Sequence, residues 1–394
     1  MRKQYKRRYN FFVFINRIWV GIIMRMFRMF KPLNKYKIKK KEPVLVLSNH
    51  QTDLDPIFIH FSFNKALCPV ATDTLMSKGV VSRLLSYAFG VIPKKKGVSD
   101  SSTTLKMMRI LKDGGAVLLF PEGNRTIAEF QFYITPKLAS FIKKTKATLV
   151  LYRLSGGTGV SPRFSHKKRK GKFTGEVKRI LKYEEYSAMS DEELMEVIKD
   201  GIKSFDSLSN QTFKSRYQAE YLERTLFICP KCKKMHTLKS TGEYLTCQNC
   251  GLSVKYNEQL HFETDDPTFK FAILNDWYQY QKQVIKETDF SGVIFEDHDI
   301  EVYLSIPYKK RELLEKGTIK LTDEALYFND FEIKLIDIVG ASQISGTKLS
   351  VATKGETYLV VGKGRFNALK YVLLFNKLDT TMKIEKLDDY FTLD

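Results

Sequence analysis

The chain has 394 residues, with 65 Lys and Arg against 44 Asp and Glu and a formal net charge of +21. Hydrophobic residues make up 43% and aromatic residues 13%, which excludes a disordered, collagen-like or low-complexity protein. At this length two or three domains are expected. Residues 1–42 hold 14 Lys or Arg and a single acid, Glu42. A polyanionic partner is therefore predicted for this segment and not for the whole chain.

The N-terminal segment combines basic and apolar residues. Residues 11–30 are apolar and aromatic, with three arginines spread through them, and lie between RKQYKRR and KYKIKKK. The longest apolar run, Ile18–Met24, is far shorter than the roughly 20 residues that span a bilayer. No small-residue cleavage site follows it, so it is not a clean signal peptide. We expect residues 1–42 to form a basic amphipathic segment on a membrane surface, in which residues 11–30 are an interfacial helix and the flanking residues a basic rim for anionic lipids. The alternative is a core helix with a solvated basic tail.

Short apolar strands then alternate with helices. Such a pattern predicts an α/β layer fold with a largely parallel sheet, here over residues 43–210. Ser190 and Glu193 form a capping box for a helix that runs to about Phe205. The other predicted elements are strands at 44–47, 116–120 and 147–152 and helices that begin at 56 and cover 101–112.

The last third of the chain has a different periodicity. A helical linker is expected over 258–290, with its helix at Pro267–Thr288. From about Val293, segments of period-two alternation follow one another, and one amphipathic helix, Phe366–Leu378, comes last. Antiparallel strands followed by a single helix are the order of a PH-like domain, which we predict for residues 291–394.

The first chemical motif reads SNHQTDLDP and directly follows the first strand. The spacing of His50 and Asp55 is weak evidence alone, because His261 and Asp266 share it. However, His50 leaves the end of a buried strand, where ligands bind in α/β sheets, and Asp55 lies at a helix start. A turn there can bring the carboxylate to the imidazole, fix its tautomer and stabilise the imidazolium while the other nitrogen takes a proton. In the alternative, Asp55 only caps the helix.

The second motif, FPEGNRT at 120–126, also lies at a strand end. Gly123 permits close approach of the backbone to a ligand, and Arg125 can bind a phosphate through two hydrogen bonds. Between the two motifs, three consecutive lysines at 94–96 follow an apolar stretch. A solvated charge run is the ordinary interpretation of such a cluster.

In this order and spacing, NHQTDLDP, GVIPKKK, a helix and GAVLLFPEGNRT resemble the glycerolipid acyltransferases, such as the lysophosphatidic acid acyltransferases. The resemblance covers roughly residues 20–210. It implies that His50 deprotonates the acceptor hydroxyl, that Asp55 orients His50, and that the hydroxyl attacks an acyl thioester without an acyl-enzyme. It further implies that the glycerol-phosphate acceptor is bound by Glu122, Gly123, Asn124 and Arg125.

Two departures from the family pattern concern substrate binding. The family commonly has an arginine where this chain has Lys96. Lysine keeps the charge that binds phosphate but loses the planar fork, so Lys96 is still expected in the site. The fourth family motif usually carries a proline, which residues 149–154 lack, and we assign no residue there. The basic stretch 163–172 serves a phosphorylated donor or the membrane surface, or is a solvated loop.

Two C-x-x-C pairs lie within residues 227–257, namely Cys229 with Cys232 and Cys247 with Cys250. Their spacing is typical of a zinc ribbon with four thiolate ligands. Four protein ligands leave no open position, so the Zn²⁺ is expected to be structural, and no catalytic cofactor is expected. Cys68 is left over and is predicted to be a buried thiol.

The sequence thus predicts a glycerolipid-acyltransferase-like α/β sheet layered with helices, followed by a zinc ribbon and a β-rich PH-like domain. The predicted enzyme is a peripheral O-acyltransferase of phospholipid synthesis on the cytoplasmic face of a membrane. Its donor would be acyl-CoA or an acyl carrier protein, and its acceptor a lysophospholipid. Two alternatives are a zinc-ribbon nucleic-acid-binding protein and a non-catalytic lipid-binding scaffold. Because more than half of the net charge lies beside an apolar aromatic segment, we expect lipid and not nucleic acid as the partner.

Overall fold

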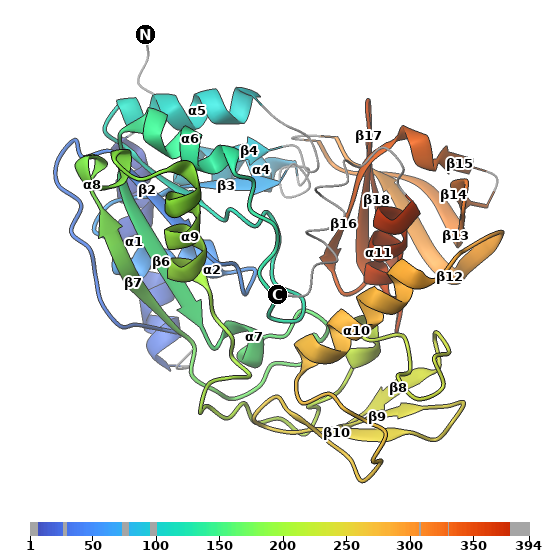
Figure 1. Ribbon diagram of the computed structural model, residues 1–394. Helices are drawn as coiled ribbons and strands as arrows, with labels where there is room; N and C mark the ends of the chain where they lie inside the picture. Colours follow the sequence, from blue (N-terminus) through green and yellow to red (C-terminus); the bar gives the residue numbers. More distant parts are fainter. Residues whose placement is uncertain are drawn as a thin grey trace.

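The computed structural model describes residues 7–26, 30–72, 79–94, 101–306, 309–329 and 331–378. A mixed α/β sheet with its helices forms one side of the molecule, and an antiparallel sheet forms the other (Figure 1). A small four-stranded sheet lies below them in this view. The chain therefore has the mixed α/β core and the β-rich C-terminal part that the sequence predicted.

The α/β sheet has seven strands in the order β1-β7-β6-β2-β5-β3-β4. Neighbouring strands are parallel except for the antiparallel pair β6 and β7. The expectation of a largely parallel sheet is therefore confirmed. The strands are β1 Lys31–Pro32, β2 Val44–Ser48, β3 Cys68–Thr72, β4 Ile92–Lys94, β5 Ala116–Leu119, β6 Thr148–Ser155 and β7 Thr174–Leu181.

Alternating side chains of the central strands enter two apolar layers. Leu45 and Leu47 of β2 join the core beneath helices α5, α6 and α9, whereas Val44 and Val46 join the layer that contains α2. This alternation follows from the period-two geometry of a strand with both faces covered. The helices are α2 Asp55–Ile59, α5 Ser101–Lys112, α6 Lys137–Thr145, α7 Gly157–Val160, α8 Tyr183–Ser187 and α9 Asp191–Ile202, with the 3-10 turn η1 at His60–Ser62. The capping box of Ser190 and Glu193 opens α9 as predicted.

Glu42 fixes the start of β2 to the neighbouring strands. Its carboxylate accepts hydrogen bonds from Tyr36, the Lys39 amide, Thr148 and Lys182. Partial burial alone raises its pKa, but these donors, with the Lys182 ammonium foremost, lower the pKa of Glu42 to about 2. The carboxylate is therefore charged throughout the neutral range.

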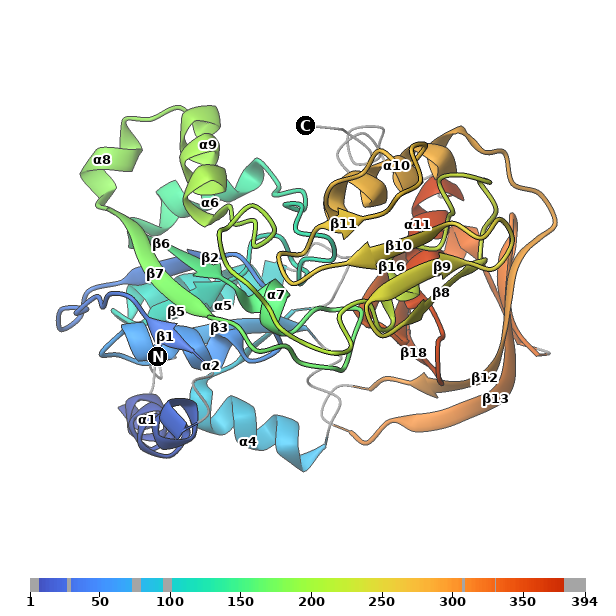
Figure 2. The ribbon, with the colours of Figure 1, turned by 90° about the horizontal axis from the view of Figure 1, so that it is seen from below.

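Two helices lie side by side outside the sheet, as Figure 2 shows: α1, Arg7–Met26, and α4, Val80–Phe89. Arg8 of α1 donates a hydrogen bond to the Tyr87 carbonyl of α4 (3.0 Å), and its guanidinium lies 3.9 Å from the Tyr87 ring centroid. Arg17 points inward and donates to the His60 carbonyl (2.6 Å). These contacts attach both helices to the α/β domain.

The outer faces of α1 and α4 are apolar and exposed. On α1 the exposed side chains recur at helical spacing, and Trp19 is the most exposed of them at 68%. We call these two stripes together the apolar platform: Phe11, Phe14, Ile15, Ile18, Trp19 and Ile22 on α1, and Val80, Val81, Leu84 and Tyr87 on α4. Neither helix, nor any other in the described part of the chain, has the length and hydropathy to cross a bilayer.

The C-terminal part is a second seven-stranded sheet, antiparallel throughout, in the order β15-β14-β13-β12-β18-β17-β16. Helix α11, Ala368–Leu378, packs against β16 and β17. The strands are β12 Val293–Leu304, β13 Glu312–Thr322, β14 Ala325–Phe328, β15 Phe331–Lys334, β16 Ile338–Ser345, β17 Lys348–Thr353 and β18 Thr357–Gly362, with the 3-10 turn η3 at Leu335–Asp337. A β-rich domain closed by one helix is as expected, and its PH-like nature stays a prediction.

The cysteine segment forms a four-stranded antiparallel sheet in the order β11-β10-β9-β8. Its core is continuous with those of helix α10, Leu274–Glu287, and the C-terminal sheet. Helix α10 begins seven residues after the predicted start at Pro267, because His261 and Ile273 pair as an extended bridge before it. The remaining elements are the 3-10 turn η2 Leu222–Arg224 and strands β8 Leu238–Thr241, β9 Tyr244–Cys247, β10 Ser253–Tyr256 and β11 Phe262–Glu263.

Candidate functional site

His50 and Asp55 lie together at the carboxyl end of β2. The His50 Nδ1 atom is 2.8 Å from Asp55 Oδ2. Asp55 is fully buried, and its Oδ2 atom also accepts the amides of Gln51 (2.6 Å) and Thr52 (2.9 Å), while Oδ1 accepts the Thr52 hydroxyl (2.5 Å). A buried carboxylate with these donors has a fixed orientation. It selects the His50 tautomer that carries its proton on Nδ1, which leaves Nε2 free to accept one.

The His50 ring is held from a second side by Phe120, whose ring stacks on it with centroids 4.2 Å apart. The His50 side chain is 21% exposed. Its Nε2 atom has no hydrogen-bond partner among the residues that the structure describes. The imidazole is thus held in place through Nδ1, while Nε2 is available to accept a proton, as a general base requires.

The second motif is joined to the first by backbone contacts. Thr126 donates its amide to the His50 carbonyl (2.9 Å), and Arg125 Nε donates to the Gln51 carbonyl (3.0 Å). The Arg125 guanidinium also reaches the Ser161 carbonyl (3.2 Å) and the carboxylate of Asp53 (3.0 Å). Asp53 is largely exposed, so an incoming phosphate can replace it on Arg125 without disturbing a buried group.

A cavity of about 460 Å³ lies in front of these residues. His50, Gly123, Asn124 and Arg125 all line it, so the structure brings together four of the predicted site residues. Gly123 has a φ of +68°, which favours glycine, and apart from its two chain neighbours no described residue has an atom within 4 Å of the position its Cβ would take. Part of the lining is apolar: Pro56, Val70, Ala71, Leu119, Phe120, Ile344 and Leu359.

Glu122 points elsewhere. It lines a separate small cavity of about 20 Å³, which His50 also borders, and accepts the Phe132 amide (3.1 Å). Burial raises the pKa of Glu122 to about 8, so its carboxyl is protonated at neutral pH. Its expected role in acceptor binding stays a prediction. Lys96, also expected in the site, lies outside the described residues.

The competing histidine does not form a pair with its aspartate. His261 Nε2 lies 2.8 Å from the Ser207 carbonyl oxygen. The Asp266 carboxylate instead accepts hydrogen bonds from the Lys231 ammonium (2.8 Å) and the Thr268 hydroxyl. The identical spacing in sequence therefore gives a different structure, because no strand end and helix start bring these two side chains together.

Sequence reasoning missed several residues that position the site. Asn49 is buried and exchanges two hydrogen bonds with the backbone of Leu154 in β6 (2.9 and 2.8 Å), which fixes the loop that carries His50. Its place in the motif beside His50 was the available signal. Arg163 and Arg169 are buried, at 7% and 5% exposure, which contradicts a solvated loop at these two positions of the basic stretch 163–172. Nothing in the local pattern distinguishes them from the exposed lysines of the same stretch, Lys168 and Lys170.

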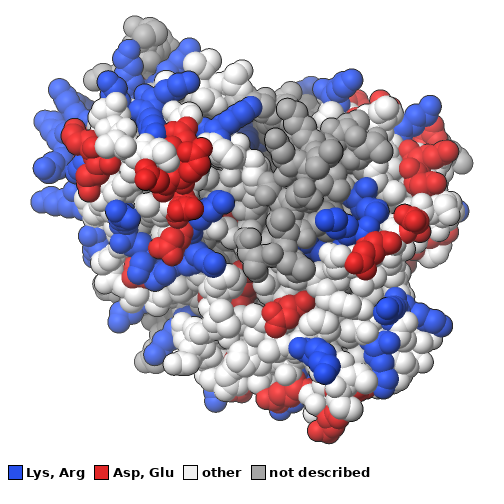
Figure 3. Space-filling model, viewed as in Figure 1, with Lys and Arg blue, Asp and Glu red and all other residues white. Residues whose placement is uncertain are grey.

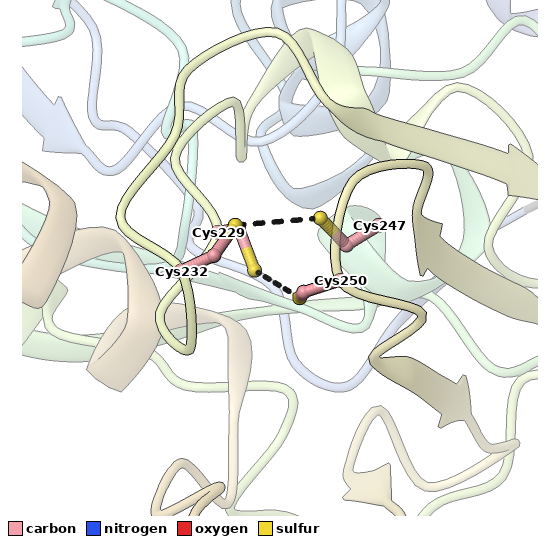
Figure 4. A group of neighbouring side chains, drawn as sticks. All are labelled: Cys229, Cys232, Cys247 and Cys250. Atoms are coloured by element: carbon pink, nitrogen blue, oxygen red, sulfur yellow. Dashed lines mark hydrogen bonds between the residues drawn. The ribbon is translucent and has the colours of Figure 1, made fainter.

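The four paired cysteines converge on one point (Figure 4). Their Sγ atoms all lie within 4.8 Å of one another, with 3.6 Å between Cys229 and Cys250 and 3.7 Å between Cys232 and Cys247. Tetrahedral thiolate ligands at the Zn–S distance of about 2.3 Å have their sulfurs about 3.8 Å apart. The four residues therefore fit a metal ion of this kind.

The two cysteine turns have the same construction. Lys233 donates its amide to the Cys229 carbonyl and Gly251 donates to the Cys247 carbonyl, and both residues have a positive φ. His236, which follows the first pair, lies apart from the cluster and packs against the rings of Phe227 and Phe295. Burial lowers the pKa of His236 to about 3, so this imidazole stays neutral. Cys68 is buried, as expected.

Comparison with known proteins identifies the α/β part. Residues 31–151 match the model of the acyltransferase family. The chain therefore carries an acyltransferase domain over these residues, in the part where its motifs resemble those of the glycerolipid acyltransferases. The crystal structure of the 1-acyl-sn-glycerophosphate (LPA) acyltransferase PlsC from Thermotoga maritima is similar, with 17% sequence identity and a TM-score of 0.40 over 49% of this chain and 84% of that chain. A search of curated proteins gave no match.

Proposed function

We propose that this protein transfers a fatty acyl chain from an acyl thioester to the free hydroxyl of a lysophosphatidic-acid-like acceptor. The observation that carries the proposal is the His50–Asp55 pair, placed at the edge of a cavity that Gly123 and Arg125 also line. The donor would be acyl-CoA or an acyl carrier protein.

In the proposed reaction, His50 Nε2 accepts the proton of the acceptor hydroxyl while the hydroxyl oxygen attacks the thioester carbonyl carbon. The imidazolium that forms is stabilised by the Asp55 carboxylate, whose position is fixed by three other hydrogen-bond donors. When the C–S bond breaks, the leaving thiolate takes the proton from His50. The base is then regenerated, and no acyl-enzyme is formed.

The cavity suits a substrate that is both charged and apolar. Arg125 offers a guanidinium to a phosphate once Asp53 is displaced, as the family resemblance implies. The apolar part of the lining, which includes Val70 and Leu359, suits an acyl chain. A lysophospholipid carries both groups in one molecule.

The apolar platform supports a position on a membrane surface. Ten exposed apolar or aromatic side chains on α1 and α4 face away from the protein, which is unusual for a surface that meets only water. Arg7 and Arg8 begin α1, and most of the chain's excess positive charge lies in residues 1–42. On the face seen in Figure 3, Lys and Arg are interspersed with Asp and Glu. We infer a peripheral enzyme on the cytoplasmic face of an anionic membrane.

We infer further that the four cysteines hold a structural Zn²⁺. All four ligand positions would come from the protein, so the ion would have no site for substrate. Zinc binding in such a unit supplies folding free energy on the order of 10 kcal/mol.

The test is an assay with purified protein, a panel of acyl thioesters and a panel of acceptors, followed by mass spectrometry of the lipids. Phosphatidic acid formed from lysophosphatidic acid is the expected product. Turnover of none of the acceptors, with protein that is folded and zinc-loaded, would refute the proposal. Nucleic acid is included as a competitor and is expected to have no effect.

A further inference from the structure

The C-terminal sheet reaches the catalytic cavity. Beyond the acyltransferase motifs, the 460 Å³ cavity is lined by residues from the second sheet and the loop before β13: Arg311, Gln343, Ile344, Ser345, Lys348 and Leu359. Four of these belong to β16 or β17, which form a hairpin with its turn at Gly346 and Thr347. One wall of the cavity that holds His50 is therefore built by a hairpin about 300 residues further along the chain.

The hairpin is fixed to the second acyltransferase motif by a buried side chain. Arg163 donates hydrogen bonds to the carbonyl of Arg125 and to the carbonyl of Gln343 in β16. Arg224 makes a parallel connection, since it donates to the carbonyls of Phe164 and Gly364. Buried guanidinium groups that join backbone to backbone restrict relative movement, so the hairpin has a set position beside the motif.

Positive charge dominates the cavity wall. Among the residues that the structure describes, five cationic side chains line it, and the one acid, Asp53, is already paired with Arg125. Lys348, at the start of β17, is partly buried, and its side-chain ammonium makes no hydrogen bond or ion pair with any residue that the structure describes. Gln343 also lines the cavity, and its buried Oε1 atom has no partner in the described part of the chain. A partly desolvated ammonium without a counter-charge favours an anionic ligand.

From these observations we propose that the β16–β17 hairpin completes the substrate site and that Lys348 binds a phosphate group of a substrate. The inference rests on the proposed acyl transfer and adds to it a substrate-binding residue from outside the acyltransferase domain. The phosphate belongs either to the acceptor headgroup or to the pantetheine-linked donor, and both present the same chemistry to an ammonium. The C-terminal domain would then contribute directly to substrate recognition.

Steady-state kinetics of Lys348→Gln tests the proposal, because glutamine keeps most of the side-chain length and removes only the charge. We expect KM for one of the two substrates to rise about tenfold, the cost of one charge-assisted hydrogen bond, with little change in kcat. Lys348→Arg should keep KM near the wild-type value. Unchanged KM values for both substrates would overturn the proposal.

Which KM rises identifies the source of the phosphate. If it is the acceptor, the difference between wild type and Lys348→Gln should disappear with monoacylglycerol, which lacks the phosphate. If it is the donor, the difference should disappear with an acyl N-acetylcysteamine thioester. Lys354→Gln is the matched control, since Lys354 is an exposed lysine just after β17 and outside this cavity. Its KM values should equal those of the wild type.

A second measurement separates this inference from the proposed function. Inorganic pyrophosphate should raise the Tm of the wild-type protein and of Lys354→Gln more than that of Lys348→Gln. If the wild type turned over none of the thioesters and acceptors, the proposed function would fail. The pyrophosphate titration would then decide the phosphate site alone, and equal Tm shifts in all three proteins would overturn it.

Discussion

Replacing Asp55 by asparagine removes one charge from the catalytic pair and keeps its shape. Three N–H groups point at Asp55 Oδ2: the His50 Nδ1–H and the amides of Gln51 and Thr52. The asparagine oxygen must take this position, because an NH₂ group there would face three donors. Its NH₂ group then faces the Thr52 hydroxyl, which can accept a hydrogen bond. We therefore expect Asp55→Asn to fold normally and to keep the correct His50 tautomer.

The expected fall in kcat of Asp55→Asn follows from the loss of the carboxylate charge alone. A hydrogen bond to a charged partner contributes about 1.5–3 kcal/mol, against about 0.5–1.5 kcal/mol for a neutral one. The difference of about 1–2 kcal/mol corresponds to a kcat about 5- to 30-fold lower. Removal of the base in His50→Ala should cost more, about 10²–10⁴-fold.

The assay is acyl transfer to lysophosphatidic acid at saturating substrates, with Tm measured to confirm folding. The double variant His50→Ala with Asp55→Asn should be no slower than His50→Ala, because Asp55 acts only through His50. In serine proteases the corresponding asparagine fixes the wrong tautomer and lowers kcat about 10⁴-fold. A loss of that size here, or no loss at all, would refute the orientation argued for Asp55. His261→Ala serves as the control and should be fully active.

Cys250→Ser should lose the bound zinc and become sensitive to protease between about residues 225 and 260, whereas Cys68→Ser should do neither; metal analysis that found no zinc in the stable wild type would contradict this. Trp19→Glu should weaken pelleting with anionic vesicles, while Leu208→Glu, an equally exposed apolar site off the platform, should not. Glu42→Gln should lower the free energy of unfolding at pH 7. Because the pKa of Glu42 is depressed from 4.5 to about 2, its stabilisation exists above about pH 4.5 and fades as the pH falls toward 2. Urea unfolding at pH 7 and pH 3 should therefore show that the free energies of unfolding of the wild type and of Glu42→Gln differ less at pH 3.

Local patterns predicted much of the α/β domain. The helix expected at residues 101–112 has those bounds in the structure, where α5 ends before Gly114 and Gly115. His50 and Asp55 could be paired from sequence because the strand end and the helix start constrain the short turn between them. The cysteine cluster was predictable for a similar reason, since each C-x-x-C turn fixes its own two ligands.

Features that depend on distant contacts were not predictable. Strand β16 contains Gly, Ala, Ser and Gln, whose strand preference is low, and it is ordered by pairing with β17. Lys348 resembles any surface lysine in the sequence, and only the packing of two domains places it in the cavity. Helix α4 has an ordinary amphipathic pattern, which indicates an apolar face but cannot show that this face points away from the protein.

In the proposed reaction, His50 is the base of the acyl transfer. The most direct test is single-turnover formation of phosphatidic acid from lysophosphatidic acid and an acyl thioester, compared between wild type, His50→Ala and His261→Ala. We expect the wild type and His261→Ala to form product, and His50→Ala to form it at a rate at least about 10²-fold lower. A His50→Ala protein that forms product at the wild-type rate would contradict this role of His50.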